Sequence, residues 1–169
     1  HQYMCESGYE EVRSKIAGWM NQKYKTSYGI NNIIMTNGVA GGLNMVLRAL
    51  LNPGDEVLVF RPYYPAYIGF AENWNGKIIE VDPGEDFQPD FEDLEGKITK
   101  RTKVVIVNSP HNPTGVIYTK ETATKISEIL KSKQKEYGHA ICLLSDEPYR
   151  DLVYIEEELP WWPDFYQNT

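Results

Sequence analysis

The sequence has few cysteines, no strongly basic segment and neither of two common nucleotide-binding motifs. Its 169 residues include two cysteines, Cys5 and Cys142, which form no Cys-x-x-Cys pair, so we expect neither a disulfide nor a zinc site. Acidic residues outnumber basic ones, 24 against 17, which argues against a nucleic-acid partner. Gly-x-Gly-x-x-Gly and Gly-Lys-Ser/Thr are absent; a nucleotide-binding α/β domain is therefore a minor alternative.

Long apolar runs and a secretory signal pattern are also missing. The apolar runs have the length of strands and fall well short of a membrane-spanning helix. Together with two unpaired cysteines, this favours a cytoplasmic protein with no membrane partner. The chain starts at His1 and stops just after a Trp- and Pro-rich stretch, so we expect a piece of a longer polypeptide.

Short apolar runs alternate with amphipathic segments along the sequence. The runs predict strands at residues 33–36, 56–60, 77–81, 103–107 and 140–144. The amphipathic segments predict helices at about residues 7–24, 39–51, 65–75, 89–94 and 120–137. Such alternation is typical of an α/β protein with three layers, in which helices cover both faces of a mainly parallel sheet.

Two local features refine the first helix and the end of the chain. The segment from Ser7 to Glu10 has the form of a capping box. The helix that it opens would turn an apolar face inward, formed by Val12, Ile16, Trp19 and Met20. Residues 156–169 are interpreted as a loop.

A glycine-rich turn lies between the first predicted strand and the second predicted helix. Gly38 lets the chain turn tightly, and the N–H groups of Val39 and Ala40 would then point outward at the positive end of a helix dipole. Such a turn can hold a phosphate group. Taken alone, a packing role for these glycines is the more common explanation.

Polar side chains follow the last two predicted strands, at the sheet edge where ligands of open α/β sheets bind. Asp146 closes a fully apolar strand, where an ionised carboxylate is costly without a cationic partner. A protonated pyridine nitrogen would supply that partner. The structural alternatives for Asp146 are an N-cap or an ion pair with Arg150. Glu147 is a weaker candidate, because alternation along the strand points it away.

Three further side chains could bind a flat heterocycle at this edge. Asn112 could donate to an anionic phenolic oxygen, and Tyr149 could donate a second hydrogen bond; a plain turn is the alternative for Asn112. Tyr64 could stack on the ring, although Tyr63 remains open for the same role and a core aromatic is the alternative for both. His111 is interpreted as a structural hydrogen-bonding residue without a catalytic role.

Taken together, these segments resemble fold-type I pyridoxal-phosphate enzymes, specifically the class I and II aminotransferases similar to aspartate aminotransferase. The matching segments appear in order over nearly the whole chain: Tyr3 with 8–13, 36–40, 52–57, 62–65, 112–115 and 146–149. Any one of them is a weak signal, and six in order form a strong one.

The resemblance implies a role for each candidate residue. Gly38, Val39 and Ala40 would hold the phosphate of pyridoxal 5'-phosphate through backbone N–H groups; many family members carry a hydroxyl at the position of Val39. Tyr64 would stack on the pyridine ring. Asn112 and Tyr149 would bind its phenolic oxygen, and Asp146 would bind its nitrogen. Tyr3 would reach the cofactor phosphate of a neighbouring subunit. Tyr3 thereby implies a homodimer.

The resemblance also implies what the chain lacks. The Schiff-base lysine of the family, the arginine that grips the substrate carboxylate and the arginine that completes the phosphate site all lie downstream of residue 169. The last two strands of the family's seven-stranded sheet are missing too, so the sheet would have a gap beside residues 33–36. We therefore expect this segment alone to be inactive and to need completion by more chain.

These features give one leading hypothesis and two alternatives. Residues 1–155 would form part of the large cofactor-binding domain, with the dimer-contact tyrosine and its helix in 1–25 and βα units in 30–155. Residues 156–169 would lead into the remainder. The intact protein would be an aminotransferase of amino-acid biosynthesis, acting on an amino acid and a 2-oxo acid. The alternatives are a pyridoxal-phosphate-dependent lyase or cyclase of the same fold, or a non-catalytic cofactor-binding fragment.

Overall fold

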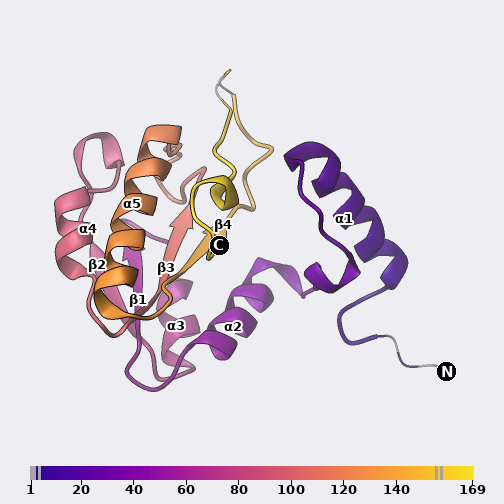
Figure 1. Ribbon diagram of the computed structural model, residues 1–169, viewed down its shortest axis with the longest axis horizontal. Coiled ribbons are helices and arrows are strands. Elements are labelled where there is room, and N and C mark those ends of the chain that lie inside the picture. Colours follow the sequence, from indigo (N-terminus) through magenta and orange to yellow (C-terminus); the bar gives the residue numbers. More distant parts are fainter. Residues whose placement is uncertain (1–2, 4, 155, 157) are drawn as a thin grey trace. The chain divides into compact units, whose positions relative to one another are not determined.

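The structure is a computed structural model that describes residue 3, residues 5–154, residue 156 and residues 158–169. The chain divides into two compact units, His1–Met45 and Val46–Thr169. Helix α2 (Gly38–Leu50) begins in the first unit and ends in the second. Figure 1 shows the order of the elements along the chain.

The second unit contains a sheet of four parallel strands. These are β1 (Glu56–Phe60), β2 (Lys77–Val81), β3 (Thr102–Asn108) and β4 (Cys142–Asp146), in the order β2-β1-β3-β4. The helices between them are α3 (Ala66–Glu72), α4 (Phe91–Lys97) and α5 (Lys120–Tyr137). The predicted α/β fold with a parallel sheet is confirmed, and α5 has its predicted bounds.

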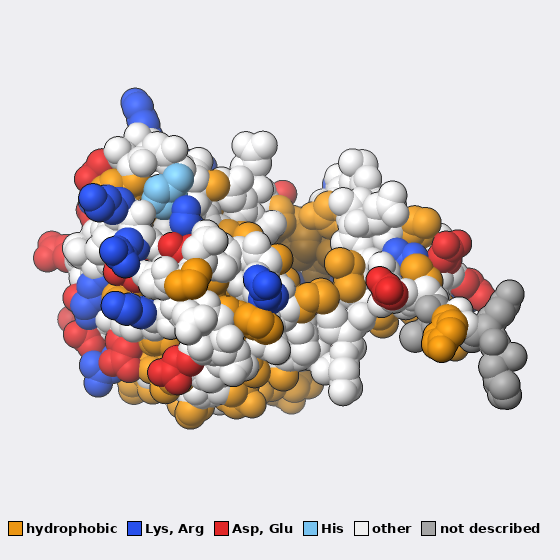
Figure 2. All heavy atoms as spheres, turned by 90° about the horizontal axis from the view of Figure 1, so that it is seen from below, with side chains coloured by type: hydrophobic (Ala, Val, Ile, Leu, Met, Phe, Trp, Pro, Cys, Tyr) orange, Lys and Arg blue, Asp and Glu red, His pale blue; other side chains and the backbone are white. Residues whose placement is uncertain are grey.

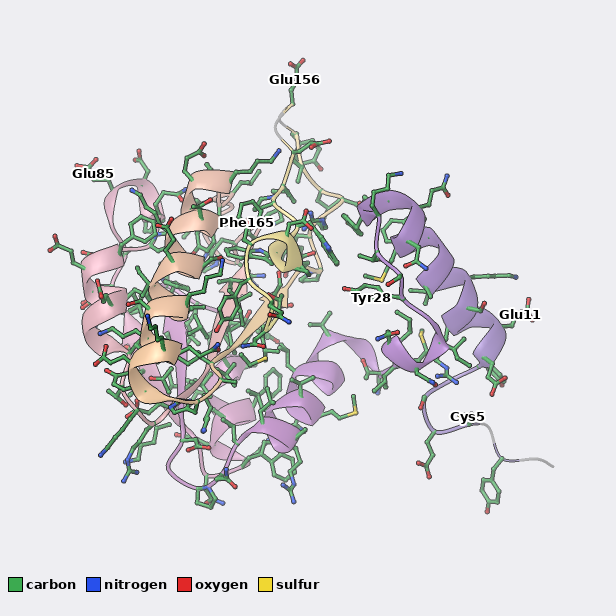
Figure 3. The ribbon with its side chains drawn as sticks, in the orientation of Figure 1. Cys5, Glu11, Tyr28, Glu85, Glu156 and Phe165 are labelled. Carbon is green, nitrogen blue, oxygen red and sulfur yellow. The ribbon has the colours of Figure 1, made fainter. Side chains whose placement is uncertain are left out.

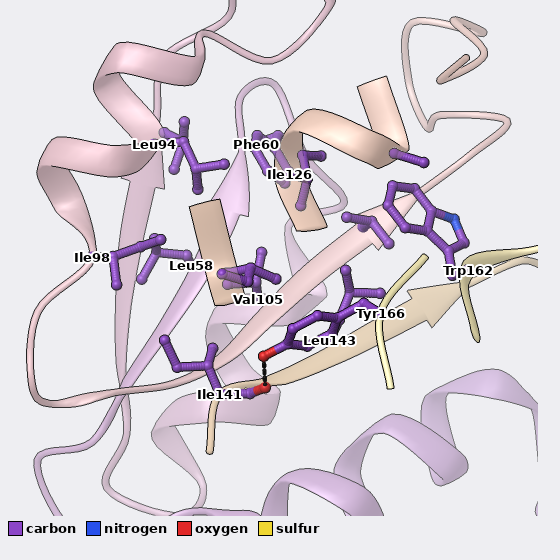
Figure 4. Close-up of a cluster of buried hydrophobic side chains, with 14 of the residues drawn as sticks. Leu58, Phe60, Leu94, Ile98, Val105, Ile126, Ile141, Leu143, Trp162 and Tyr166 are labelled. Atoms are coloured by element: carbon purple, nitrogen blue, oxygen red, sulfur yellow. Dashed lines mark hydrogen bonds between the residues drawn. The ribbon is translucent and has the colours of Figure 1, made fainter. Parts of the chain in front are cut away.

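Helices α4 and α5 cover one face of this sheet, and the main apolar core lies between these helices and the sheet (Figures 1 and 4). Leu58 and Leu143 of the sheet pack in the same cluster as Leu94 of α4 and Ile126 of α5. Each of these four side chains is fully buried. The central part of this face is therefore apolar, as a sheet covered by helices requires.

The C-terminal segment, interpreted from sequence as a loop, joins this core. It forms a short 3₁₀ helix, Trp162–Asp164, and both Trp162 and Tyr166 are buried in the cluster. The hydroxyl of Tyr166 donates to the carbonyl oxygen of Ile141 at 2.7 Å, drawn as the dashed line in Figure 4. The N–H of Leu143 donates to the carbonyl oxygen of Asn168 at 2.8 Å, which covers part of the outer edge of β4.

The other face of the sheet changes character along the strands. Tyr67 and Ala71 of α3 are buried, and side chains at alternate positions of the strands turn away from the α5 side. At the carboxyl ends of β3 and β4 these positions are the polar residues Asn108 and Asp146, which are register partners. Both are buried, so this end of the sheet holds polar groups in a dry environment.

The first unit is organised around the guanidinium of Arg13, which is buried. Its nitrogens donate to the carbonyl oxygens of Gly8 at 3.2 Å and Ile30 at 2.9 Å. This ties helix α1 (Glu10–Tyr24) to the segments on both sides of it. Cys5, labelled in Figure 3, is exposed on the segment before α1.

Three predictions for the first unit are wrong. Residues 33–36 form no strand and pair with none of the four strands of the described sheet; the N–H of Met35 donates to the carbonyl oxygen of Ser7 instead. Helix α1 is capped at Tyr9, with no side-chain cap from Ser7. Arg13 and Ala17 form the buried face of α1, whereas the expected inward residues Val12 and Trp19 are exposed.

Two surface features bear on the expected partners. Within the part of the chain that the structure describes, no helix combines the length and the apolar character needed to span a bilayer. On the face shown in Figure 2, acidic and basic side chains of the second unit lie interspersed.

Candidate active site

Asp146 lies at the last position of β4, with 6% of its surface exposed. The hydroxyl of Tyr67 donates to its Oδ2 at 2.5 Å. The other carboxylate oxygen, Oδ1, is buried and has no hydrogen-bond partner among the described residues. A buried acceptor without a donor is costly, so Oδ1 marks a place where a ligand donor would be favourable.

Burial and the Tyr67 hydroxyl act in opposite directions on this carboxyl group. Burial raises the pKa of Asp146 above its ordinary value, and the hydrogen bond from Tyr67 lowers it again in part. Burial first, and the hydrogen bond to Asp146 second, raise the pKa of Tyr67, so the phenol stays a donor. Of the two groups, Asp146 is therefore the one that ionises first.

Tyr67 was not predicted from the sequence. It lies on α3, 79 positions before Asp146, and it is one of 12 tyrosines. Pro65 precedes α3 and sets where the helix begins. The loop motif that drew attention to Tyr64 is the one signal that points to this neighbourhood.

Asn112 and Tyr149 lie in the same network as Asp146. The side-chain nitrogen Nδ2 of Asn112 donates to the hydroxyl of Tyr149 at 3.4 Å. Asn108 joins them to the strand end: its Nδ2 donates to the main-chain carbonyl of Asp146 at 2.8 Å, and its Oδ1 accepts from the main-chain N–H of Asn112 at 2.7 Å. The structure thus brings Asp146, Asn112 and Tyr149 together.

Tyr64 lies beside this network. Its ring meets the ring of Tyr67 edge-on at 5.8 Å between centroids, and it is 41% exposed. An exposed ring next to the Asp146 partner is free to face a ligand. The ring of Tyr63 stacks on Tyr67 at 6.4 Å, but its hydroxyl donates to Glu80 at 2.6 Å.

The structural alternatives for Asp146 and the secondary candidates can now be placed. Arg150 pairs with Glu147 at 2.8 Å, and Glu147 also accepts from Ser145 at 2.7 Å. The ion pair with Arg150, one of the alternatives for Asp146, is thus made by Glu147 instead. His111 is buried, and its Nδ1 is 3.0 Å from the hydroxyl of Thr114; burial lowers its pKa.

The remaining predicted residues belong to the first unit. Gly38 has a positive φ of 71° and begins α2. Val39 and Ala40 follow in the first helical turn, where N–H groups lack intrahelical acceptors. Tyr3 is fully exposed. Within the described residues no group of His, Cys, Asp and Glu could hold a metal ion.

Comparison with known proteins gives a consistent result. The sequence profile described as aminotransferase class I and II matches residues 1–165. The aspartate aminotransferase of Sulfolobus acidocaldarius is 36% identical over 174 residues, which cover 96% of this chain and 42% of that protein. That of Thermotoga maritima is 35% identical over 157 residues, which cover 92% of this chain and 40% of that protein.

Solved structures agree with these matches. The crystal structure of an amino transferase from Eubacterium rectale superposes with a TM-score of 0.95 at 38% identity, covering 100% of this chain and 43% of that one. The solved structure of a single mutant of Thermus thermophilus aspartate aminotransferase gives a TM-score of 0.84 at 34% identity, covering 94% of this chain and 41% of that one. This chain therefore spans about two fifths of the length of these relatives.

The two tyrosine–carboxylate hydrogen bonds of this region form a matched pair, one buried and one exposed. Tyr67→Phe removes the donor to buried Asp146, and we expect a loss of about 1.5–3 kcal/mol in the free energy of unfolding. Tyr63→Phe removes the donor to exposed Glu80, and we expect a loss below about 1 kcal/mol. Urea unfolding of the complete polypeptide that carries this chain measures both, and equal losses would contradict the buried role of Tyr67.

The raised pKa of Asp146 predicts a pH dependence for the cofactor-free protein. Because the pKa of Asp146 is raised in the folded protein, its protonated form stabilises the fold. This stabilisation is complete at pH values below the ordinary carboxyl pKa, and it is lost as pH rises through the pKa of Asp146 in the folded protein. Asp146→Asn stays neutral throughout. Its melting temperature relative to wild type should therefore climb as pH rises above the ordinary carboxyl pKa of about 4.

Exposed Asp164 supplies the control for this measurement. Asp164→Asn makes the same chemical change at an exposed carboxylate, so the comparison isolates the effect of burying the charge. A difference between Asp146→Asn and wild type that stays flat or falls as pH rises would show that the buried charge does not weaken the fold.

Proposed function

Because the chain belongs to the family of class I and II aminotransferases, we propose that it is the cofactor-binding part of an aminotransferase. The enzyme would transfer an amino group between an amino acid and a 2-oxo acid through pyridoxal 5'-phosphate. The observation that carries this proposal is the buried carboxylate of Asp146, with one oxygen left without a donor at the carboxyl end of a parallel strand.

The residues around Asp146 suit this cofactor. A protonated pyridine nitrogen is both a cation and a single N–H donor, and Oδ1 of Asp146 has no hydrogen-bond donor among the described residues. The amide of Asn112 and the hydroxyl of Tyr149 are within 3.4 Å of each other, which suits two contacts to one phenolic oxygen. When bound, the cofactor supplies a cationic ring that stabilises negative charge at the substrate α-carbon.

Each side chain has a distinct task in this proposal. Asp146 holds the proton on the ring nitrogen, because separating that proton from a buried carboxylate would leave the charge unpaired. Tyr67 orients the carboxylate by occupying Oδ2. Asn112 and Tyr149 bind the phenolic oxygen, and Tyr64 stacks on the ring face.

The proposal also assigns roles to the first unit. The N–H groups at Gly38, Val39 and Ala40 hold the cofactor phosphate, as a helix N-terminus can. Tyr3 serves the phosphate of a neighbouring subunit in a homodimer. Residues 1–155 belong to one large domain of the intact enzyme, with 156–169 leading on from it. The unpaired cysteines support a cytoplasmic enzyme, here of amino-acid biosynthesis.

Reduction with borohydride tests the reaction class. We expect the complete polypeptide, reduced with pyridoxal 5'-phosphate bound, to carry the label on one lysine beyond residue 169 in peptide maps. Nicotinamide adenine dinucleotide serves as the control and should leave the melting temperature unchanged, whereas pyridoxal 5'-phosphate should raise it. If no lysine is labelled, the proposed enzyme is wrong.

Asp146→Asn tests the assignment of the ring-nitrogen partner. We expect the variant to fold and to lose turnover by roughly a hundredfold or more, since a neutral amide no longer keeps the nitrogen protonated. Single-turnover kinetics of the complete polypeptide would measure the loss. Wild-type turnover in this variant would rule out Asp146 as that partner.

A further inference from the structure

The side chain of Asn108 connects two residues that the proposed function places on opposite sides of one ring. Asn108 ends β3, is 5% exposed, and is the register partner of Asp146. Its Nδ2 donates to the main-chain carbonyl of Asp146 at 2.8 Å, and its Oδ1 accepts from the main-chain N–H of Asn112 at 2.7 Å. One amide therefore holds a strand end and a loop together.

The chemistry of these two main-chain groups requires an amide here. A carbonyl can only accept and an N–H can only donate, so the bridging side chain must offer one donor and one acceptor in a short planar group. Aspartate would lack the donor and would bring a second buried charge close to Asp146. Alanine would leave the buried carbonyl of Asp146 without this donor.

The hydrogen bonds around Asn108 form a closed circuit. The chain runs from Asp146 through one turn to Tyr149, whose hydroxyl accepts from Nδ2 of Asn112 at 3.4 Å. The N–H of Asn112 returns to Asn108, and Asn108 returns to Asp146. The link from Asn108 to Asp146 is buried and the link to Asn112 is partly buried, so a shift of either residue relative to the other must break a hydrogen bond that is shielded from water.

We propose that Asn108 is a positioning residue that sets the separation between the ring-nitrogen partner Asp146 and the phenolic-oxygen partner Asn112. This inference rests on the proposed function. Asn108 itself need not touch the cofactor: it acts by fixing where two other residues present their polar atoms. Loss of Asn108 should weaken the contacts at both ends of the ring, because Asp146 and Asn112 are then no longer held at a fixed separation.

The test compares two substitutions, each of which removes a side-chain amide that hydrogen-bonds to the main chain at or beside one end of β4. Asn108→Ala removes the bridge at the carboxyl end. Gln134→Ala is the control at the other end, where Oε1 of Gln134 accepts from the N–H of Ile141 at 3.3 Å and from Nδ2 of Asn168 at 2.7 Å. Both are made in the complete polypeptide.

The readouts are the dissociation constant of pyridoxal 5'-phosphate, the pH midpoint of the absorbance change of the bound cofactor, and the melting temperature without cofactor. We expect Asn108→Ala to weaken binding roughly ten- to a hundredfold and to shift the pH midpoint. Gln134→Ala should lower the melting temperature while it leaves the affinity and the midpoint at wild-type values.

A second variant covers the case in which Asn108→Ala does not fold. Asn108→Asp keeps the size and the acceptor for Asn112 but loses the donor to Asp146, so it too should shift the midpoint. Wild-type affinity and midpoint in the Asn108 variants, or an equal shift in Gln134→Ala, would overturn the inference and leave the proposed function intact. A wild-type protein that binds no pyridoxal 5'-phosphate would remove the proposed function and this inference with it.

Discussion

The buried carboxylate of Asp146 imposes the main constraint on the sheet unit. It closes β4 on the face where Tyr67 of α3 is buried, and an unpaired charge is costly there. Tyr67 satisfies one oxygen, and the other has no partner among the described residues. Burial raises the pKa of this group, so the ionised form weakens the fold until a cation shares the site. The ionised carboxylate thereby lowers the local stability of the fold.

The strands that position this carboxylate were largely predictable, because each is a short apolar run between turn-forming residues. Strands β1 and β2 have their predicted bounds, whereas β4 continues to Asp146 because main-chain pairing with β3 does not depend on side-chain polarity. Residues 33–36 are just as apolar but form no strand. A strand needs a neighbour, and local sequence does not report whether one is present.

Tyr67 and Asn108 carry no local signal, for different physical reasons. Tyr67 reaches Asp146 from 79 positions away, so its role depends on how α3 packs, which short-range patterns do not encode. Asn108 looks like the polar end of an apolar run. Its role follows from the pairing of β3 with β4, which sets it opposite Asp146. Given that pairing, the sequence would have indicated Asn108, whereas Tyr67 needed the tertiary structure.

The register of β4 decides which environment its final side chain meets. Alternate residues of a strand face opposite sides, so a slip of one position would turn Asp146 toward the side of Leu143. That side is filled by apolar groups of α4, α5 and the C-terminal segment, including Ile126 and Trp162. No cationic ligand could enter so closely packed a core. On the α3 side the carboxylate meets a phenol donor, and Asn108 holds its main chain in place. The pairing of two strand ends thus separates the apolar core from the polar site within a single sheet.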